Sequence, residues 1–429
     1  MNRVDYQNHL AILKKELIAA LGCTEPIAIA YVSAKARSIL GCMPERIEVY
    51  CSGNVVKNVK GVTVPNSQGM RGIDTAAVLG VVGGNAEKDL EVLSSVTEAD
   101  VAKTRELLEA GFCKCFLEEN VENLYIRTLA IAGDESASVT VRLRHANITE
   151  ITKNGEVVFS QDAAAKSADA KAADYAAINV RSIIDFANEV EIDDVRALLD
   201  TQIRCNSALA DEGLNNSYGA EVGRTLLERG KDDVCEVAVA RAAAASDARM
   251  GGCALPAVIN SGSGNQGITV SGPVIEYANA WNCSDEQLYR ALVVSNLLAV
   301  HQKKFIGSLS AYCGAVSAGC SAGAAIMYLS GGDYDAVSRT IVNTLGNVGG
   351  IICDGAKSSC AAKIASALNG ALLAVEMSKK ERAFQSGEGL ILSDVEETIR
   401  SMGYVGKVGM ASTDVEVLNL MLGKIDLYQ

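Results

Sequence analysis

The sequence predicts an α+β fold, in which a mainly α-helical catalytic domain carries an inserted β-containing subdomain. Two observations support this class. Alternating β-branched residues are concentrated between positions 46 and 161, and strand signals nearly vanish from position 162 onward. The length of 429 residues also exceeds one small core, at about 150 residues per domain. We therefore expect N-terminal helices over 1–45 that join the catalytic domain, an α+β subdomain over 46–161, and a helical catalytic domain over 162–429.

The N-terminal segment predicts two helices with a tight corner between them. Leucines at 10, 13, 17 and 21 share one helical face, and Gly22 is expected to end that helix. Thr24 is expected to cap a second helix, which begins with Glu25-Pro26 and runs to about residue 40. Cys23 is then held in the corner between the two helices.

The middle region carries most of the strand signals. They are IEVYCSG, VKGVTVP, LYIRTLAIA, ASVTVRLRH, ITEITK and EVVFS, with Asn154-Gly155 as a hairpin turn. Helices are predicted near 72–84 and 98–111. Together these elements indicate an α+β unit of roughly 115 residues.

The C-terminal region predicts a helical body. An Ala-rich polar stretch over 162–177 is interpreted as a connector or an exposed helix. Helices are predicted near 178–189, 193–211, 214–229, 234–248, 285–302, 314–330, 333–345, 360–376 and 393–402. The helices over 314–330 and 360–376 are rich in Ala, Gly and Ser and lack a strong polar face, so both are expected to be central and closely packed.

Composition excludes several classes of protein. The net charge is −13 and no basic block occurs, which argues against binding to nucleic acid or to an anionic membrane. No apolar run is expected to reach the roughly 18–20 residues of a membrane span, and the N-terminus is unlike a signal peptide. Thirteen cysteines, an odd number, argue against a disulfide framework. We therefore expect a cytoplasmic protein with buried, catalytic or metal-bound thiols.

Three C-terminal cysteines are candidate metal ligands. Cys353 and Cys360 bracket a loop, and Ser359 is expected to cap the next helix, whose N-terminus favours a thiolate at Cys360. Cys313 lies at the start of another small-residue helix, and Cys320 is an alternative to it on a similar face. Three such thiolates can hold an iron–sulfur cluster with one open, Lewis-acidic iron. The alternative is that all of them are inert buried thiols.

Two further segments are candidates for chemistry. Cys23 directly precedes the predicted N-cap, where the helix dipole is expected to lower its pKa, so it is a candidate nucleophile, base or ligand. Packing in a corner is the alternative. The glycine-rich loop over 260–267 is a candidate anion site, although a plain turn also explains it. His9, His145 and His301 are too few for His-based chemistry and are assigned structural roles.

Three separated motifs together resemble the L-cysteine desulfidase family, which is related to the catalytic chain of iron–sulfur L-serine dehydratases. The first is Leu-Gly-Cys-Thr-Glu-Pro over 21–26, and the second is Ser-Gly-Ser-Gly-Asn-Gln-Gly over 261–267. The third is the set Cys313, Cys353 and Cys360. The resemblance spans nearly the whole chain, and the motifs occur in the same order.

The resemblance implies a function and a role for each residue. It implies a [4Fe-4S] cluster on Cys313, Cys353 and Cys360, and Cys23 as the proton acceptor. It also implies cleavage of L-cysteine to sulfide, ammonia and pyruvate without pyridoxal phosphate. Side chains of the 260–267 loop are expected to bind the substrate carboxylate. They are Ser261, Ser263, Asn265 and Gln266.

Other functions stay open on the sequence alone. An iron–sulfur L-serine dehydratase is the same class with oxygen as the leaving atom. A pyridoxal-phosphate dehydratase would need a Schiff-base lysine, for which Lys303, Lys304 and Lys357 are the candidates. A cluster-based redox sensor ranks lowest because no DNA-binding element is found. We expect a small amino-acid substrate, Cys23 close to the C-terminal cysteines, and a homodimer by analogy only.

Overall fold

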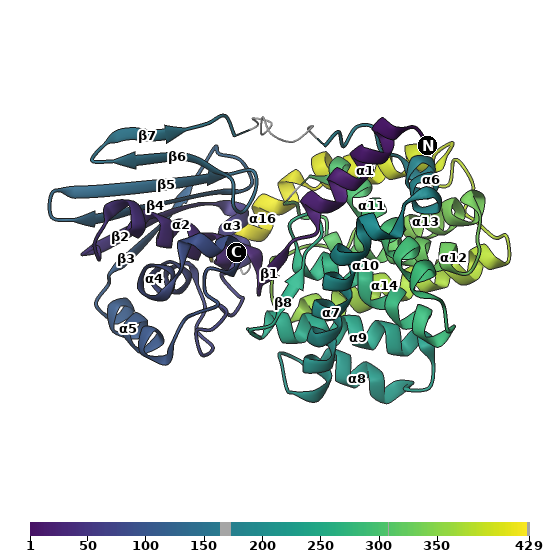
Figure 1. Cartoon of the computed structure of the whole chain (residues 1–429), viewed down its shortest axis with the longest axis horizontal. Helices are drawn as coiled ribbons and strands as arrows, with labels where there is room; N and C mark the ends of the chain where they lie inside the picture. The colour runs from purple at the N-terminus through teal and green to yellow at the C-terminus, as the bar shows by residue number, and fades with distance from the viewer. Residues whose placement is uncertain (164–172, 308, 427–429) are drawn as a thin grey trace.

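Figure 1 shows a sheet-containing body beside a larger helical body in a computed structural model of the chain, which describes residues 1–163, 173–307 and 309–426. The predicted α+β class, mainly helical, is confirmed. Each body has its own hydrophobic core, one built around α2 and the sheet and the other around the C-terminal helices. Most of the Ala-rich stretch over 162–177 lies outside the described residues.

The sheet has six strands in the order β3-β2-β4-β5-β6-β7. Their bounds are β2 (Arg46–Ser52), β3 (Cys113–Glu118), β4 (Tyr125–Ala132), β5 (Glu135–Arg142), β6 (Ile148–Lys153) and β7 (Glu156–Ser160). Only β2 and β3 are parallel, and the other neighbours are antiparallel. Asn154 and Gly155 both have positive φ and join β6 to β7, which confirms the predicted hairpin turn.

Helices accompany the sheet and connect its first strands. They are α2 (Thr24–Leu40), α3 (Gly53–Val59), α4 (Ile73–Gly83), the 3₁₀ turn η1 (Ala86–Glu91) and α5 (Glu98–Glu109). α2 packs on β4 and β5 and carries α4 against it. The strand predicted for VKGVTVP is wrong, because Val59 ends α3 and only Thr63 forms an isolated bridge, with Arg71. Here valines at helical spacing bury one face of a short helix.

The N-terminal segment differs from the prediction in a way that positions Cys23. The first helix, α1 (Arg3–Glu16), ends five residues early, and β1 (Ala19–Leu21) follows it. β1 pairs antiparallel with β8 (Pro256–Val258). Gly22, at φ +51°, therefore turns the chain out of a strand rather than capping a helix. This two-stranded ladder fixes Cys23 beside the loop that follows β8.

The helical body contains most of the chain after residue 173. Its helices are α6 (Val180–Glu189), α7 (Ile192–Asn215), α8 (Val222–Arg229), α9 (Val234–Met250), α10 (Gly264–Ala280), α11 (Asp285–Ile306), α12 (Gly314–Leu329), α13 (Tyr334–Val348), α14 (Ser359–Lys379), α15 (Val395–Tyr404), the π turn η2 (Val405–Gly409) and α16 (Ala411–Met421). Three differences from the prediction stand out. α8 begins only at Val222, and neither α10, which begins inside the predicted glycine loop, nor α16 has a predicted counterpart.

The central position predicted for α12 and α14 is confirmed by their packing. A Cβ atom on Gly319 or Gly323 of α12 would lie 3.2 or 3.0 Å from the nearest atom of α14. Small residues therefore let the two helix backbones approach closely. Among the described residues, α14 alone is long and apolar enough for a membrane span, contrary to the expectation of none. It packs against α9, α12 and α13 in the core.

Candidate active site

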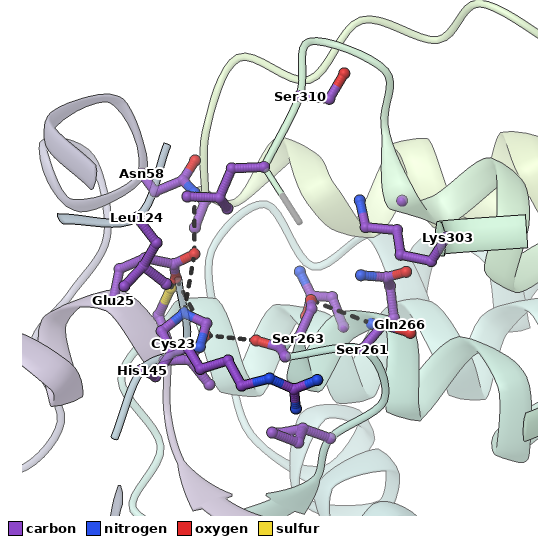
Figure 2. Close-up of a pocket in the computed structure, with 18 of the residues that line it drawn as sticks. Cys23, Glu25, Asn58, Leu124, His145, Ser261, Ser263, Gln266, Lys303 and Ser310 are labelled. Carbon is purple, nitrogen blue, oxygen red and sulfur yellow. Dashed lines mark hydrogen bonds and ion pairs between the residues drawn. The ribbon is translucent and has the colours of Figure 1, made fainter. Parts of the chain in front are cut away.

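A cavity of about 660 Å³ lies between the two bodies and collects the predicted site residues. All eight of them line it: Cys23, Ser261, Ser263, Asn265, Gln266, Cys313, Cys353 and Cys360. Figure 2 shows Cys23, Glu25, Asn58 and His145 on one side, facing Lys303 and Gln266 on the other. Residues from both ends of the chain therefore meet at one place. The predicted proximity of Cys23 to the C-terminal cysteines is confirmed.

Cys23 is the N-cap residue of α2, one position earlier than the predicted Thr24. Its Sγ donates to Glu25 Oε2 at 3.0 Å instead of capping the helix. Thr24, the expected cap, donates its hydroxyl to Gly262 O at 2.9 Å and so ties α2 to the 260–267 loop. Glu25 Oε1 also accepts from Asn58 Nδ2 at 3.0 Å. The cysteine therefore lies against a fully hydrogen-bonded carboxylate.

The electrostatics of this corner overturn one prediction. Burial and the neighbouring Glu25 carboxylate raise the pKa of Cys23 well above its usual value, outweighing any effect of the helix dipole. Burial alone would raise the pKa of Glu25, but His145 and the Cys23 thiol outweigh it and lower that pKa to about 2. In the resting site the proton is on sulfur and the charge is on Glu25.

His145 joins the sheet body to this corner. It lies in the turn between β5 and β6, and its Nε2 is 3.6 Å from Glu25 Oε1. The sequence assigns it a structural role, whereas the structure places it in the cavity wall. His9 and His301 have the structural roles that were expected: His9 stacks on Phe186, and His301 pairs with Glu396. His9 is buried.

Two short backbone segments bring Cys313 and Cys353 together. The amide of Cys313 donates to Ile351 O at 2.9 Å, and the amide of Cys353 donates to Ala311 O at 2.6 Å. This antiparallel bridge places the two thiols in hydrogen-bond contact. Cys313 is the N-cap residue of α12, as predicted from its place at the helix start. Cys320 points away, toward Ile341 O, and does not line the cavity.

Cys360 completes the set from the first turn of α14. Its Sγ lies 3.7 Å from Gly355 O, in the loop that follows Cys353. Ser358, not Ser359, is the N-cap residue, and neither hydroxyl caps the helix. Burial raises the pKa of Cys360, so the helix N-terminus does not create the thiolate that was predicted there. The prediction is wrong because desolvation outweighs the dipole.

Cys353 is instead the favoured thiolate. The hydrogen bond from Cys313 lowers its pKa, against the effect of burial, and Lys57, the Gly355 amide and Lys303 lower it further. The same hydrogen bond raises the pKa of Cys313, so the pair shares one proton. Lys57 is itself buried and paired with Asp414 of α16. One anionic sulfur beside two protonated ones is a set that releases protons when it binds a metal.

The donor set fits an iron–sulfur cluster better than a single ion. Within the described ranges, no three His, Cys, Asp or Glu side chains are placed to hold one metal ion. A cubane offers a separate iron to each cysteine and therefore holds its ligands farther apart. Three sulfurs on one cavity wall, with lysine charges beside them, match that requirement. The residues present therefore fit the [4Fe-4S] group.

The loop predicted to bind an anion continues directly into α10. Ser263 caps that helix by accepting from the Gln266 amide, and Ser261 donates its hydroxyl to Asn260 Oδ1. Gln266 Oε1 is buried and makes no hydrogen bond within the described chain. Asn265 Oδ1 accepts from Arg249 Nη1 at 3.1 Å. Of the four predicted residues, Gln266 therefore has an unused polar atom.

Sequence reasoning missed several buried charged groups in the cavity. Glu25 was assigned only to a helix turn, and Lys57 and Arg249 were not considered. Among the Schiff-base candidates, Lys304 donates to Tyr175 O and Ile178 O, and Lys357 pairs with Asp354. Lys303 makes no ion pair in the described parts of the chain, and burial lowers its pKa. Charged residues inside otherwise apolar helices were the only available signal.

Comparison with known proteins identifies the class. Residues 87–419 match the family described as "Serine dehydratase alpha chain". A relative named "UPF0597 protein" from Lachnoclostridium phytofermentans is 49% identical over 97% of this chain and 100% of its own length. One of the same name from Finegoldia magna is 47% identical over 97% and 100%. A third, from Aeromonas hydrophila, is 40% identical over 97% and 99%.

The chain belongs to the serine dehydratase alpha chain family. Its relationship to the catalytic chain of iron–sulfur serine dehydratases, expected from the three motifs, is thereby confirmed. The family indicates a lyase-type enzyme. The names of the UPF0597 relatives state neither a substrate nor a cofactor.

Proposed function

We propose that the protein is a [4Fe-4S]-dependent, pyridoxal-phosphate-independent β-eliminase, a cysteine desulfidase that converts L-cysteine to sulfide, ammonia and pyruvate. One observation carries the proposal. Cys23 and the three cysteines Cys313, Cys353 and Cys360 line the same cavity, although they come from opposite ends of the chain. The serine dehydratase-like family supports the reaction type, and the choice of L-cysteine is our proposal.

Cys313, Cys353 and Cys360 would hold the cluster. When bound, it supplies a Lewis-acidic iron that stabilises negative charge on the substrate or leaving group. Lys303 lies near Cys353 and Cys313, where its ammonium offsets the negative charge of the thiolates. Lys57 does the same from the sheet body while it is anchored by Asp414.

Cys23 and Glu25 would move the Cα proton together. Because Cys23 rests as a thiol, its proton must leave before its sulfur can act as a base. Glu25 Oε2, 3.0 Å away, already accepts the hydrogen bond of this thiol. Transfer of the proton to Glu25 is uphill, because the pKa of Glu25 is about 2 and that of Cys23 is raised, and the charge of Arg249, which lowers the pKa of Cys23, offsets part of this cost. The Cys23 thiolate then takes the Cα proton while the Cβ–S bond breaks and sulfide leaves. The resulting aminoacrylate reacts with water to give pyruvate and ammonia.

An anaerobic assay with both amino acids tests this function. We expect equal amounts of sulfide and pyruvate from L-cysteine, and no sulfide from the Cys23→Ala variant. L-Serine is the second candidate substrate, because the family match is to serine dehydratase. Pyruvate from L-serine without sulfide from L-cysteine would reverse the assignment. A band above 400 nm that shifts with added amino acid would instead indicate pyridoxal phosphate.

Three further properties stay predictions. A homodimer is expected by analogy, and light scattering of the purified chain measures it. The absence of nucleic-acid partners is expected from a net charge of −13 without a basic block, and the cytoplasmic location is likewise a prediction from the sequence.

A further inference from the structure

The cavity contains an arginine whose charge is not balanced by the protein. Arg249, near the end of α9, is only 2% exposed and lines the cavity. It makes no ion pair with a carboxylate in the described residues. Its Nη1 donates to Asn265 Oδ1 at 3.1 Å, and its Nε has no hydrogen-bond partner. Buried guanidinium groups are normally paired, so this one indicates a missing anion.

The position of Arg249 beside the start of α10 increases the excess of positive charge. Its guanidinium lies against Gly264, the first residue of α10, where an added Cβ would come within 2.3 Å of Nε. A side chain at position 264 would therefore displace the guanidinium from this place. The N-terminus of a 17-residue helix carries partial positive charge, which adds to that of the guanidinium. An anion between them would be stabilised by both.

The other buried cations of the cavity have negative neighbours. Lys57 pairs with Asp414, and Lys303 lies near Cys353, the favoured thiolate of the cavity. Arg249 lies near enough to Cys23 and Cys360 for its charge to lower the pKa of both thiols, against the rise that burial causes. The unbalanced charge is thus next to the proposed base and on the same side as one proposed cluster ligand.

We propose that Arg249 binds the α-carboxylate of the amino-acid substrate, with Asn265 as the positioning residue that orients the guanidinium. The assignment of the anion as an amino acid rests on the proposed function. It also changes the role expected for the 260–267 loop. In this arrangement the loop backbone and Asn265 hold the Arg249 side chain in place, and the Arg249 guanidinium supplies the positive charge that binds the carboxylate. A carboxylate fixed there places the neighbouring Cα beside Cys23, where the proton must be removed.

Calorimetric titration with unreactive probes tests the proposal. L-Alanine has the α-carboxylate but no β leaving group, and L-alaninamide lacks the carboxylate. The full-length protein, purified without oxygen, is expected to bind L-alanine about 10- to 100-fold more tightly than L-alaninamide. Arg249→Gln should abolish that preference. Arg249→Lys should keep part of it, because lysine retains the charge but not the bidentate geometry.

A second arginine on the same helix provides the matched control. Arg241 pairs with Asp211 and Glu276 and does not line the cavity. Arg241→Gln should therefore keep the preference for L-alanine. Equal binding of L-alanine by wild type and Arg249→Gln, with normal circular dichroism, would overturn the proposal. The wild-type protein could form pyruvate from neither amino acid while Arg249→Gln still abolishes L-alanine binding. In that case the carboxylate site stands and the proposed reaction fails.

Discussion

Two groups of closely spaced cysteines in this molecule have opposite surroundings. Cys113 and Cys115 lie on β3, at the edge of the sheet, with their sulfurs 3.8 Å apart. Cys115 is exposed, and the charged groups that act on Cys113 are Cys115, Asp74 and Cys51, all of which raise its pKa. Cys353 has a similar thiol contact with Cys313, yet its pKa is lowered. The largest cause is the Cys313 thiol, and Lys57, the Gly355 amide and Lys303, none of which acts on Cys113, lower the pKa of Cys353 further.

This comparison shows why cysteine spacing alone is a poor guide to metal binding. The sheet pair is closer in sequence than any two of the cavity cysteines. Only the cavity provides positive charge, backbone amides and enclosure from solvent, which together favour a thiolate ligand. Variants that change one group at a time test whether the cavity cysteines, and not the sheet-edge pair, bind metal.

The largest effect is expected from loss of one proposed cluster ligand. Cys353→Ala should lose both bound iron and β-elimination activity, by at least about 1000-fold in kcat/KM. Iron analysis and pyruvate formation measure the two losses after anaerobic purification. Cys115→Ala, the matched change at the sheet edge, should keep both within about twofold. Loss of iron from Cys115→Ala would contradict this, because it would place a metal ligand at the edge of the sheet.

A smaller loss, confined to turnover, is expected in the Cys23–Glu25 pair. Glu25→Gln removes the acceptor for the thiol proton, so kcat should fall by about 10²–10⁴-fold while iron content is kept. The pH dependence of Cys23 alkylation, followed by peptide mass spectrometry, distinguishes this role from a structural one. It should change in Glu25→Gln, because that carboxylate raises the pKa of Cys23. An unchanged alkylation profile together with normal turnover would exclude the proton transfer.

A loss of stability is expected at the ion pair that links α3 to α16. Lys57 is 2% and Asp414 14% exposed at the side chain, so Lys57→Met should lower the free energy of unfolding by about 3–5 kcal/mol. Chemical denaturation measures this loss. Lys60→Met, three residues away at the exposed end of the same helix, should cost less than about 1 kcal/mol. Equal free energies of unfolding for the two variants would mean that the Lys57–Asp414 ion pair does not stabilise the fold.

The smallest predicted change is a pH-dependent gain in stability at Asp247. Burial raises the pKa of this carboxyl to about 6 from an ordinary 3.8. The folded state therefore binds the proton more tightly than the unfolded state, and stability falls as pH rises from about 4 to 6. Asp247→Asn should be more stable than wild type by about 2 kcal/mol at pH 7.5. Thermal melts should show the gap closing below pH 4, and a constant gap would refute the burial explanation.

The sequence predicts the regular parts of the fold because they rest on periodicity. The helices α9, α11 and α14 begin within a residue of the predicted positions, and the Asn154-Gly155 turn is where its residues require it. The β1–β8 ladder could not be predicted, because three-residue strands carry no measurable period. That ladder nevertheless decides where Cys23 lies. Long-range pairing, which leaves little local signal, thus positions the site.

The candidate site was only partly predictable for a related reason. Cysteine positions and motif order suggested which sulfurs meet, and all four line the cavity. The protonation of Cys23 was predicted wrongly, because burial depends on neighbours from distant segments. Arg249 was missed because its one local signal is an arginine in an Ala-rich helix. Its significance depends on the absence of a carboxylate partner among the described residues, which only the packed structure reveals.

Iron and acid-labile sulfide analysis of anaerobically purified protein tests whether Cys313, Cys353 and Cys360 hold a [4Fe-4S] cluster. We expect about four iron and four sulfide per wild-type chain. We also expect a broad visible absorbance and loss of both elements in Cys313→Ala, Cys353→Ala and Cys360→Ala, but not in Cys23→Ala. Metal-free wild-type protein that still forms pyruvate from L-cysteine, or full iron retention in all three ligand variants, would contradict this assignment.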